Sequence, residues 1–126
     1  MLTLGAGAKP TPTATPTLPP EDPAITTIAR REFVAWQAGV VEKTRYAPEA
    51  QAKLTDESIS NVSKALSSYG ALLHTQWMGY LQIVGGPPGE VGYTYRMECV
   101  NAPLFEQLMI GPDCKIDSID FREKLH

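Results

Sequence analysis

The spacing of apolar residues changes once along this chain, near Leu72, and this change restricts the fold more than any other feature. Before Leu72, apolar side chains recur every three to four residues, as on one face of an α-helix. After it, they alternate with polar side chains, as in a half-buried strand. A run of helices followed by a run of strands is the order of an α+β fold. We therefore predict N-terminal helices, one long and one or two shorter, packed on a curved four-stranded antiparallel sheet.

Helix-start and helix-stop signals place the helices. Asp22 before Pro23 provides an N-cap followed by a proline at the first helical position, and Gly39 is expected to end this long helix. A second helix is expected to begin at residues 55–57 (Thr-Asp-Glu), whose carboxylates suit the positive end of the helix dipole. Residues 40–52, between the two, predict a short helix or a turn.

The alternating part of the chain predicts two hairpins. With the loop 85–89 (Gly-Gly-Pro-Pro-Gly) at the centre of the first hairpin, Trp77 lies opposite Met97, and Leu81 shares their buried face. Gly79 interrupts the first strand and indicates a bulge or a bend. The four strands are expected at residues 72–84, 90–100, 104–110 and 114–122.

The alternation is irregular in the last two strands, where apolar residues occupy both parities. A bulge that switches the faces accounts for this pattern, as does burial of both faces. In either case one of two carboxylates, Glu106 or Asp117, is expected to point inward. Burial would raise its pKa and make it a plausible general base.

Residues 1–22 have a composition that cannot build a core. From Lys9 to Pro20 the chain is almost entirely proline and threonine, which is typical of a stiff, extended tether. We therefore divide the chain into a disordered tail or tether at 1–22 and one domain at 23–126. Residues 6–8 (Ala-Gly-Ala) have the small-x-small form of a signal-peptidase site, but they also fit a start-site or cloning remnant. The tether favours an extracytoplasmic location, secreted, periplasmic or surface-tethered, and leaves a cytoplasmic one open.

Composition excludes several classes of function. The chain is 43% hydrophobic and 20% charged, and 11 Lys and Arg are interspersed with 14 Asp and Glu for a net charge of −3, so we expect no nucleic-acid partner. No apolar run is long enough for a transmembrane helix. Two cysteines are too few for a disulfide framework, and Cys99 is expected to be a small buried hydrophobe rather than a partner of Cys114. Their redox state stays open.

The element order, with the first helix ending at Gly39 and a turn at residues 111–116 (Gly-Pro-Asp-Cys-Lys-Ile) before the last strand, resembles the cystatin-like superfamily. More narrowly it is similar to the nuclear-transport-factor-two-like branch, which includes the SnoaL and ketosteroid-isomerase-like proteins. The resemblance implies a cone in which a curved sheet wraps the long helix, and often a homodimer. It also implies a bacterial exported protein of unknown function. Catalytic members carry an Asp, His or Tyr inside the cone, and none of these positions matches a residue here.

Two sets of candidate site residues follow from this arrangement. The first could line a pocket for a small apolar ligand between helix and sheet: Trp36, Tyr46, Trp77, Tyr95, Glu106 and Asp117. The second shares a polar sheet face that could support a homodimer: His74, Gln76, Arg96 and Glu98. His74 with Glu98 could also act as a general base and its orienting partner. No His or Cys spacing fits a metal, the loop 85–89 lacks the features of a phosphate loop, and we expect no cofactor.

The leading hypothesis is a non-catalytic extracytoplasmic domain that binds a protein partner or a small apolar ligand. A second is a small lyase or isomerase of the ketosteroid-isomerase kind that uses an inward carboxylate. A third is a structural accessory domain of a larger hydrolase. An open cavity with Glu106 or Asp117 inside would favour the second hypothesis, and a filled cone would contradict it.

Overall fold

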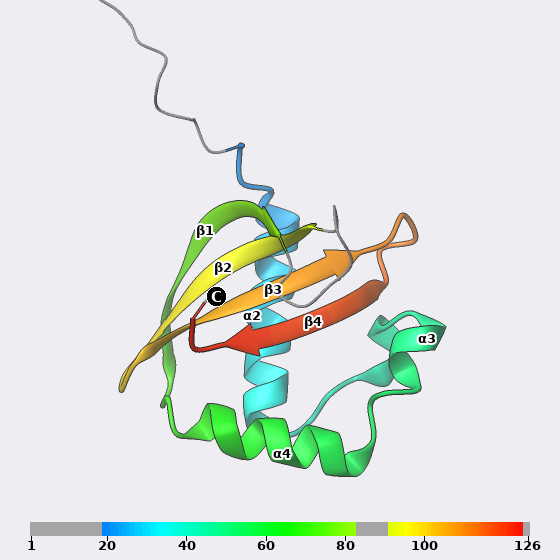
Figure 1. Cartoon of the computed structure of the whole chain (residues 1–126), viewed down its shortest axis with the longest axis horizontal. Helices are drawn as coiled ribbons and strands as arrows, with labels where there is room; N and C mark the ends of the chain where they lie inside the picture. Colours follow the sequence, from blue (N-terminus) through cyan, green and yellow to red (C-terminus); the bar gives the residue numbers. More distant parts are fainter. Residues whose placement is uncertain (1–18, 83–90, 125–126) are drawn as a thin grey trace, which may run out of the picture.

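The computed structural model describes residues 19–82 and 91–124 and has the α+β architecture that the sequence predicts (Figure 1). The helices are α2 (Pro23–Ala38), the 3-10 turn η1 (Lys43–Arg45), α3 (Pro48–Gln51) and α4 (Asp56–Ser67). The strands are β1 (Leu72–Gln82), β2 (Val91–Cys99), β3 (Pro103–Ile110) and β4 (Ile116–Arg122). They form one antiparallel sheet in the order β1-β2-β3-β4. Most of the predicted tail and the loop 85–89 lie outside the described residues.

The predicted caps of α2 are confirmed. The side chain of Asp22 accepts a hydrogen bond from the backbone N–H of Ala24, and Pro23 occupies the first turn. Gly39 ends the helix with φ of 76°, a left-handed conformation that glycine adopts without the steric cost of a Cβ. Helix α4 begins as expected at Thr55, whose side chain and that of Ser58 satisfy each other's backbone N–H groups in a capping box.

The C-terminal end of α2 is joined to α4 by side-chain hydrogen bonds. Gln37 donates to the backbone oxygens of Leu66 and Gly70 at 3.0 and 2.7 Å, and Ser63 donates to the backbone oxygen of Gln37 at 2.8 Å. These bonds satisfy backbone carbonyls near the ends of both helices, which have no partner within the helix. Figure 1 shows the result: α4 runs across the end of α2, while the curved sheet covers α2 along its length.

The register of the first hairpin differs from the prediction. Trp77 lies opposite Tyr95 rather than Met97. The pairing next to the loop is shifted by one residue from the predicted one, and a bulge between Trp77 and Gly79 adds a second residue to the shift. This bulge is the irregularity predicted at Gly79, which has φ of 95°. It also reverses the faces beyond that point. Leu81 pairs with Gly92 and is therefore on the face opposite to Trp77, contrary to the prediction.

For the last hairpin the sequence predicted either a bulge or burial of both faces, and the structure has a bulge between Met109 and Ile110. Because β4 carries the extra residue, Ile116 and Ile119 lie with Leu108 and Ile110 on the concave side of the sheet, towards the helices. The core that results is a single cluster of buried side chains between α2, α4 and this concave side. Its members are Ala29, Phe33, Trp36, Tyr46, Leu54, Ile59, Leu66, Trp77, Tyr95, Met97, Cys99, Leu104, Leu108 and Ile116.

Candidate functional site

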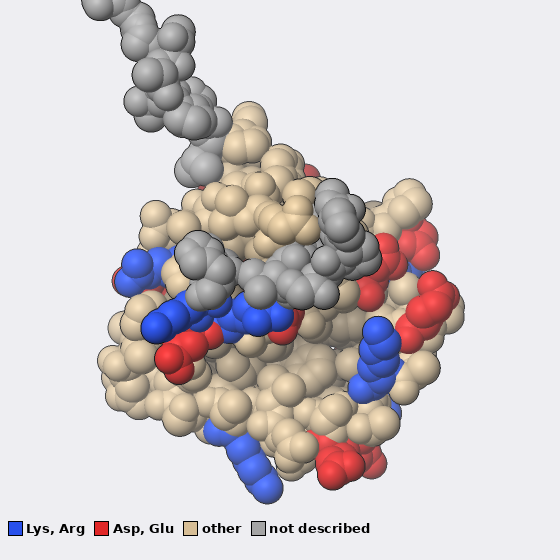
Figure 2. All heavy atoms as spheres, viewed as in Figure 1, with Lys and Arg blue, Asp and Glu red and all other residues tan. Residues whose placement is uncertain are grey.

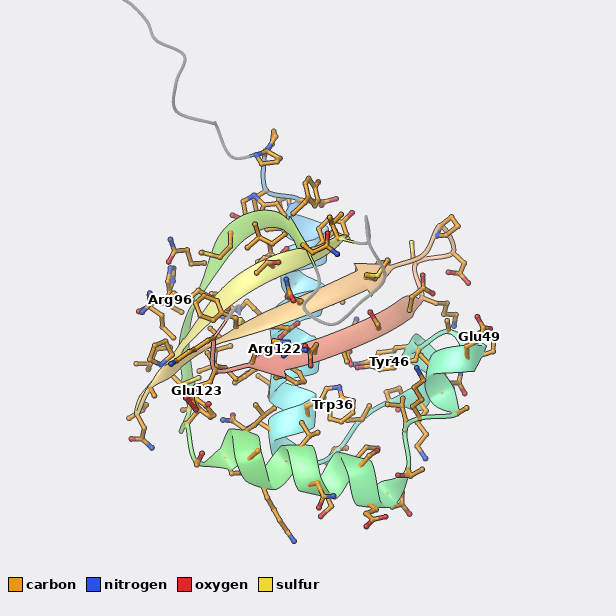
Figure 3. All side chains as sticks on the ribbon, viewed as in Figure 1. Trp36, Tyr46, Glu49, Arg96, Arg122 and Glu123 are labelled. Atoms are coloured by element: carbon orange, nitrogen blue, oxygen red, sulfur yellow. The ribbon has the colours of Figure 1, made fainter. Side chains whose placement is uncertain are left out.

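Two adjoining cavities lie between α4 and β4, beside the end of α2. The larger has a volume of about 320 Å³ and the smaller about 270 Å³. Both are lined by Trp36, Val62 and Ile119, so these three side chains form a common wall. Figure 3 shows Trp36 projecting from α2 into the space between β4 and α4, with Tyr46 beside it.

Apolar side chains form most of the remaining wall, and polar ones are added at the edges. In the larger cavity the apolar set continues with Ala65, Leu66, Tyr69, Leu104 and Phe121, and the polar set is Asn61, Asp120, Arg122 and Glu123. In the smaller cavity the apolar set continues with Tyr46, Ala50 and Leu54, and the polar set is Lys53, Ser58, Asp117 and Ser118.

A chain of buried hydrogen bonds starts at the shared wall. The indole N–H of Trp36 donates to the hydroxyl of Tyr46 at 2.7 Å, and that hydroxyl donates to Oε1 of Glu32 at 2.8 Å. The other carboxylate oxygen of Glu32 accepts from Nε of Arg31 at 2.9 Å and from Nη1 of Arg45 at 3.1 Å. Burial, together with the Glu32 carboxylate, raises the pKa of Tyr46. Tyr46 is therefore a neutral donor and acceptor whose hydrogen is already used by Glu32.

Glu106 is the inward carboxylate that the sequence predicted, and Asp117 is exposed on β4. Glu106 has no exposed surface, and neither of its oxygens has a hydrogen-bond partner within the described part of the chain. Burial raises its pKa well above the usual value, and the charge of Glu32 adds to the shift. Glu106 does not line either of the two cavities. It lies in the sheet between Tyr95 and Phe121.

The predicted ligand-binding residues are therefore divided between two places. Trp36, Tyr46 and Asp117 line the cavities, whereas Trp77 and Tyr95 belong to an aromatic cluster at the other end of α2. The hydroxyl of Tyr95 is held by Thr26, which donates to it at 3.1 Å. Burial raises the pKa of Tyr95 to about 12.

The predicted interface residues lie together on the outer face of the sheet. His74 pairs with Glu98, and Gln76 pairs with Arg96 across the β1–β2 ladder. Nε of Arg96 lies 3.6 Å from Oε2 of Glu98, an ion pair in which both side chains are about two-fifths exposed. Acidic and basic side chains likewise lie beside each other over this face in Figure 2. The ion pair within the chain accounts for the charged side chains on this face. A homodimer through this face stays a prediction.

Sequence reasoning missed Glu32, which is fully buried and organises the hydrogen bonds behind the cavities. A signal was present, because Glu32 lies three residues after Ala29 and four before Trp36, on the same helical stripe. A carboxylate on an apolar stripe requires partners, and Arg45 and Tyr46 reach it only because η1 folds back on α2.

Residues 19–82 and 91–124 contain no group of three or more His, Cys, Asp or Glu side chains that could hold a metal ion. No helix among them is long and apolar enough to cross a membrane. Cys99 is buried in the core and Cys114 is exposed, and both are free thiols.

Comparison of the chain with protein families, with curated proteins and with solved structures found no match.

Proposed function

We propose that this chain is a non-catalytic domain that binds a small, largely apolar molecule in the two cavities between α4 and β4. The observation that carries the proposal is the shared wall of Trp36, Val62 and Ile119, which makes one apolar surface out of two adjoining spaces. The larger volume, about 320 Å³, falls within the range of ligand pockets, and apolar walls with a few polar groups at the edge are typical of them.

The polar residues at the edge of the cavities suit a ligand with one polar end. Asp120, Arg122 and Glu123 follow one another along β4 and the residues after it, beside the larger cavity. Lys53 and Asp117 lie at the smaller one. The apolar part of a ligand would displace water from the walls, while its polar end would stay near these charged groups and solvent.

A lyase or isomerase is the second candidate, and Glu106 is the observation that favours it. A buried carboxyl with a raised pKa is suited to proton transfer. A general base, however, must come within hydrogen-bond distance of the proton it removes. Because Glu106 does not line the cavities, binding without catalysis accounts for the geometry better. Glu106→Gln is then expected to retain ligand binding.

Fluorescent apolar probes test the binding proposal directly. We expect anilinonaphthalenesulfonate and a polyene fatty acid to bind the folded chain with saturable, single-site fluorescence increases. Ala65 is exposed on α4 and lines the larger cavity, so Ala65→Trp would fill the entrance without disturbing the core. Its matched control is Lys64→Trp, one residue away and outside the two cavities. Loss of binding in the first variant alone supports the proposal. Equal binding by both variants, or no binding by the unmodified chain, contradicts it.

We further propose that the chain is an exported member of the cystatin-like, nuclear-transport-factor-two-like superfamily. The curved antiparallel sheet over a long N-terminal helix supports this placement, as does the proline- and threonine-rich segment at residues 9–20. Fractionation of cells that express the full chain would test the location. Recovery only from the cytoplasm would contradict export and leave the binding proposal intact.

A further inference from the structure

A second apolar surface lies at the opposite end of α2 from the cavities. Trp77 contacts the rings of Tyr80, Tyr93 and Tyr95, with centroid distances of 5.3, 6.1 and 5.3 Å. Tyr80 and Tyr93 contact each other at 5.2 Å. Tyr95 is buried, but Tyr80 is 48% exposed, so one side of this cluster faces solvent.

The surface continues from the aromatic rings across the sheet. A hollow of about 210 Å³ is lined by Tyr80, Tyr93, Val91, Met109 and Ile110. Val91 is 46% exposed, so it adds apolar surface beside Tyr80. We call the five residues that line the hollow, together with the largely buried Trp77 that contacts Tyr80 and Tyr93, the tyrosine groove. It shares no residue with the cavities between α4 and β4.

One contact joins Trp77 to the residues that precede α2. The indole N–H of Trp77 donates a hydrogen bond of 2.8 Å to the backbone carbonyl of Pro19. Pro19 is followed by Pro20, and a residue before proline is restricted to extended or polyproline II conformations. Proline lacks an N–H group, so Pro19 and Pro20 offer a partner only their carbonyl acceptors. A tryptophan N–H, which can only donate, is complementary to such a segment.

We propose that the tyrosine groove is a docking site for a polyproline II helix and that its occupant is this chain's own segment 10–20 (Pro-Thr-Pro-Thr-Ala-Thr-Pro-Thr-Leu-Pro-Pro). Aromatic-lined grooves bind such helices because the rings of successive prolines fit between flat side chains at little entropic cost. Pro16 and Pro19 are three residues apart, the repeat of this helix, and so fall on one edge of it. Pro19 is already anchored on Trp77.

The docked segment gives the tether two states. When it is bound in the groove, the domain is held close to whatever precedes residue 10. When it is released, the same segment becomes a spacer of about 3 Å per residue. A competing proline-rich partner would then shift the chain from the first state to the second, because both would use the same rings.

A spin label on the tail of the full chain tests the proposal. The label is placed at Ala14→Cys in a background of Cys114→Asn, because Cys114 is exposed and asparagine tolerates its positive φ. We expect loss of amide signal intensity at Val91 and Met109 in a nitrogen-15 spectrum, and retained intensity at Ser60 on α4. Mixing spin-labelled chains with isotope-labelled, spin-free chains should leave the spectrum unchanged, since docking is within one chain.

Two kinds of substitution keep the test sharp. Tyr80→Ser removes an exposed ring of the groove, and Leu73→Ser, at a more exposed position of the same strand, is its matched control. Replacing Pro10, Pro12 and Pro16 by glycine alters only the tail. Recovery of the Val91 signal with Tyr80→Ser and with the glycine tail, but not with Leu73→Ser, supports docking. Broadening that is unchanged by Tyr80→Ser, or that arises only in the mixed sample, overturns it.

Discussion

Glu106 makes a strong prediction about stability, because its carboxyl group is fully buried and has no hydrogen-bond partner among the described residues. Burial raises its pKa in the folded protein well above the value of 4.5 that it has when exposed. The folded state therefore holds this proton more tightly than the unfolded state does. It follows that the contribution of Glu106 to stability is fully present below pH 4.5 and is lost as the pH rises towards the folded pKa.

The size of the effect follows from the linkage between protons and folding. Each pH unit between the two pKa values costs about 1.4 kcal/mol of unfolding free energy. The distance between 4.5 and the raised pKa of folded Glu106 therefore sets the size of the effect. Glu106→Gln has nearly the same shape and no proton to lose. We expect it to match the unmodified chain near pH 4.5 and to become progressively more stable than it up to pH 7.

Urea unfolding, followed by tryptophan fluorescence at several pH values from 4.5 to 8, measures this difference. The control is Asp117→Asn, which removes an exposed carboxylate from the neighbouring strand β4. The quantity to compare is the difference in unfolding free energy between each variant and the unmodified chain. If the difference in unfolding free energy between Glu106→Gln and the unmodified chain does not change with pH, the reasoning is refuted. A carboxyl with the same pKa in the folded and unfolded states does not make the unfolding free energy depend on pH.

Two further substitutions test the packing around the cavities. Tyr46→Phe leaves the indole N–H of Trp36 and one oxygen of Glu32 without their partner. We therefore expect thermal and urea unfolding to show that the free energy of unfolding falls by roughly 2–4 kcal/mol. A decrease below about 0.5 kcal/mol would mean that water replaces the hydroxyl. Gly39→Ala places a Cβ at a residue with φ of 76°, 3.3 Å from Oγ of Ser63. We expect the free energy of unfolding to fall by about 1–2 kcal/mol. An unchanged urea midpoint would show that alanine is not strained at this position.

The local signals of the sequence were sufficient to predict most of the secondary structure. Asp22 with Pro23 begins α2, Gly39 ends it, and Thr55 begins α4, because capping depends on side chains and backbone groups only a few residues apart. Gly79 indicated the bulge in β1 for the same reason. The α+β class also followed, since it depends on the order of helical and alternating patterns.

The register of the first hairpin could not be predicted as reliably. The sequence indicated a bulge at Gly79 but not how it shifts the pairing, and each added residue exchanges the two faces of the strand beyond it. For that reason Leu81 lies on the face opposite to its predicted one. The cross-strand pairs that determine the shift are formed only when the whole sheet packs on α2.

The sequence by itself determined that this chain has helices before strands, a proline-rich segment before the domain, and an inward carboxylate at either Glu106 or Asp117. Only the tertiary structure decided which carboxylate is buried, because that depends on the bulge between Met109 and Ile110. It also separated Trp36 and Tyr46 from Trp77 and Tyr95, placing them at opposite ends of α2. Sites form from residues distant in the chain, and the spacing of residues along a sequence carries no record of those long-range contacts.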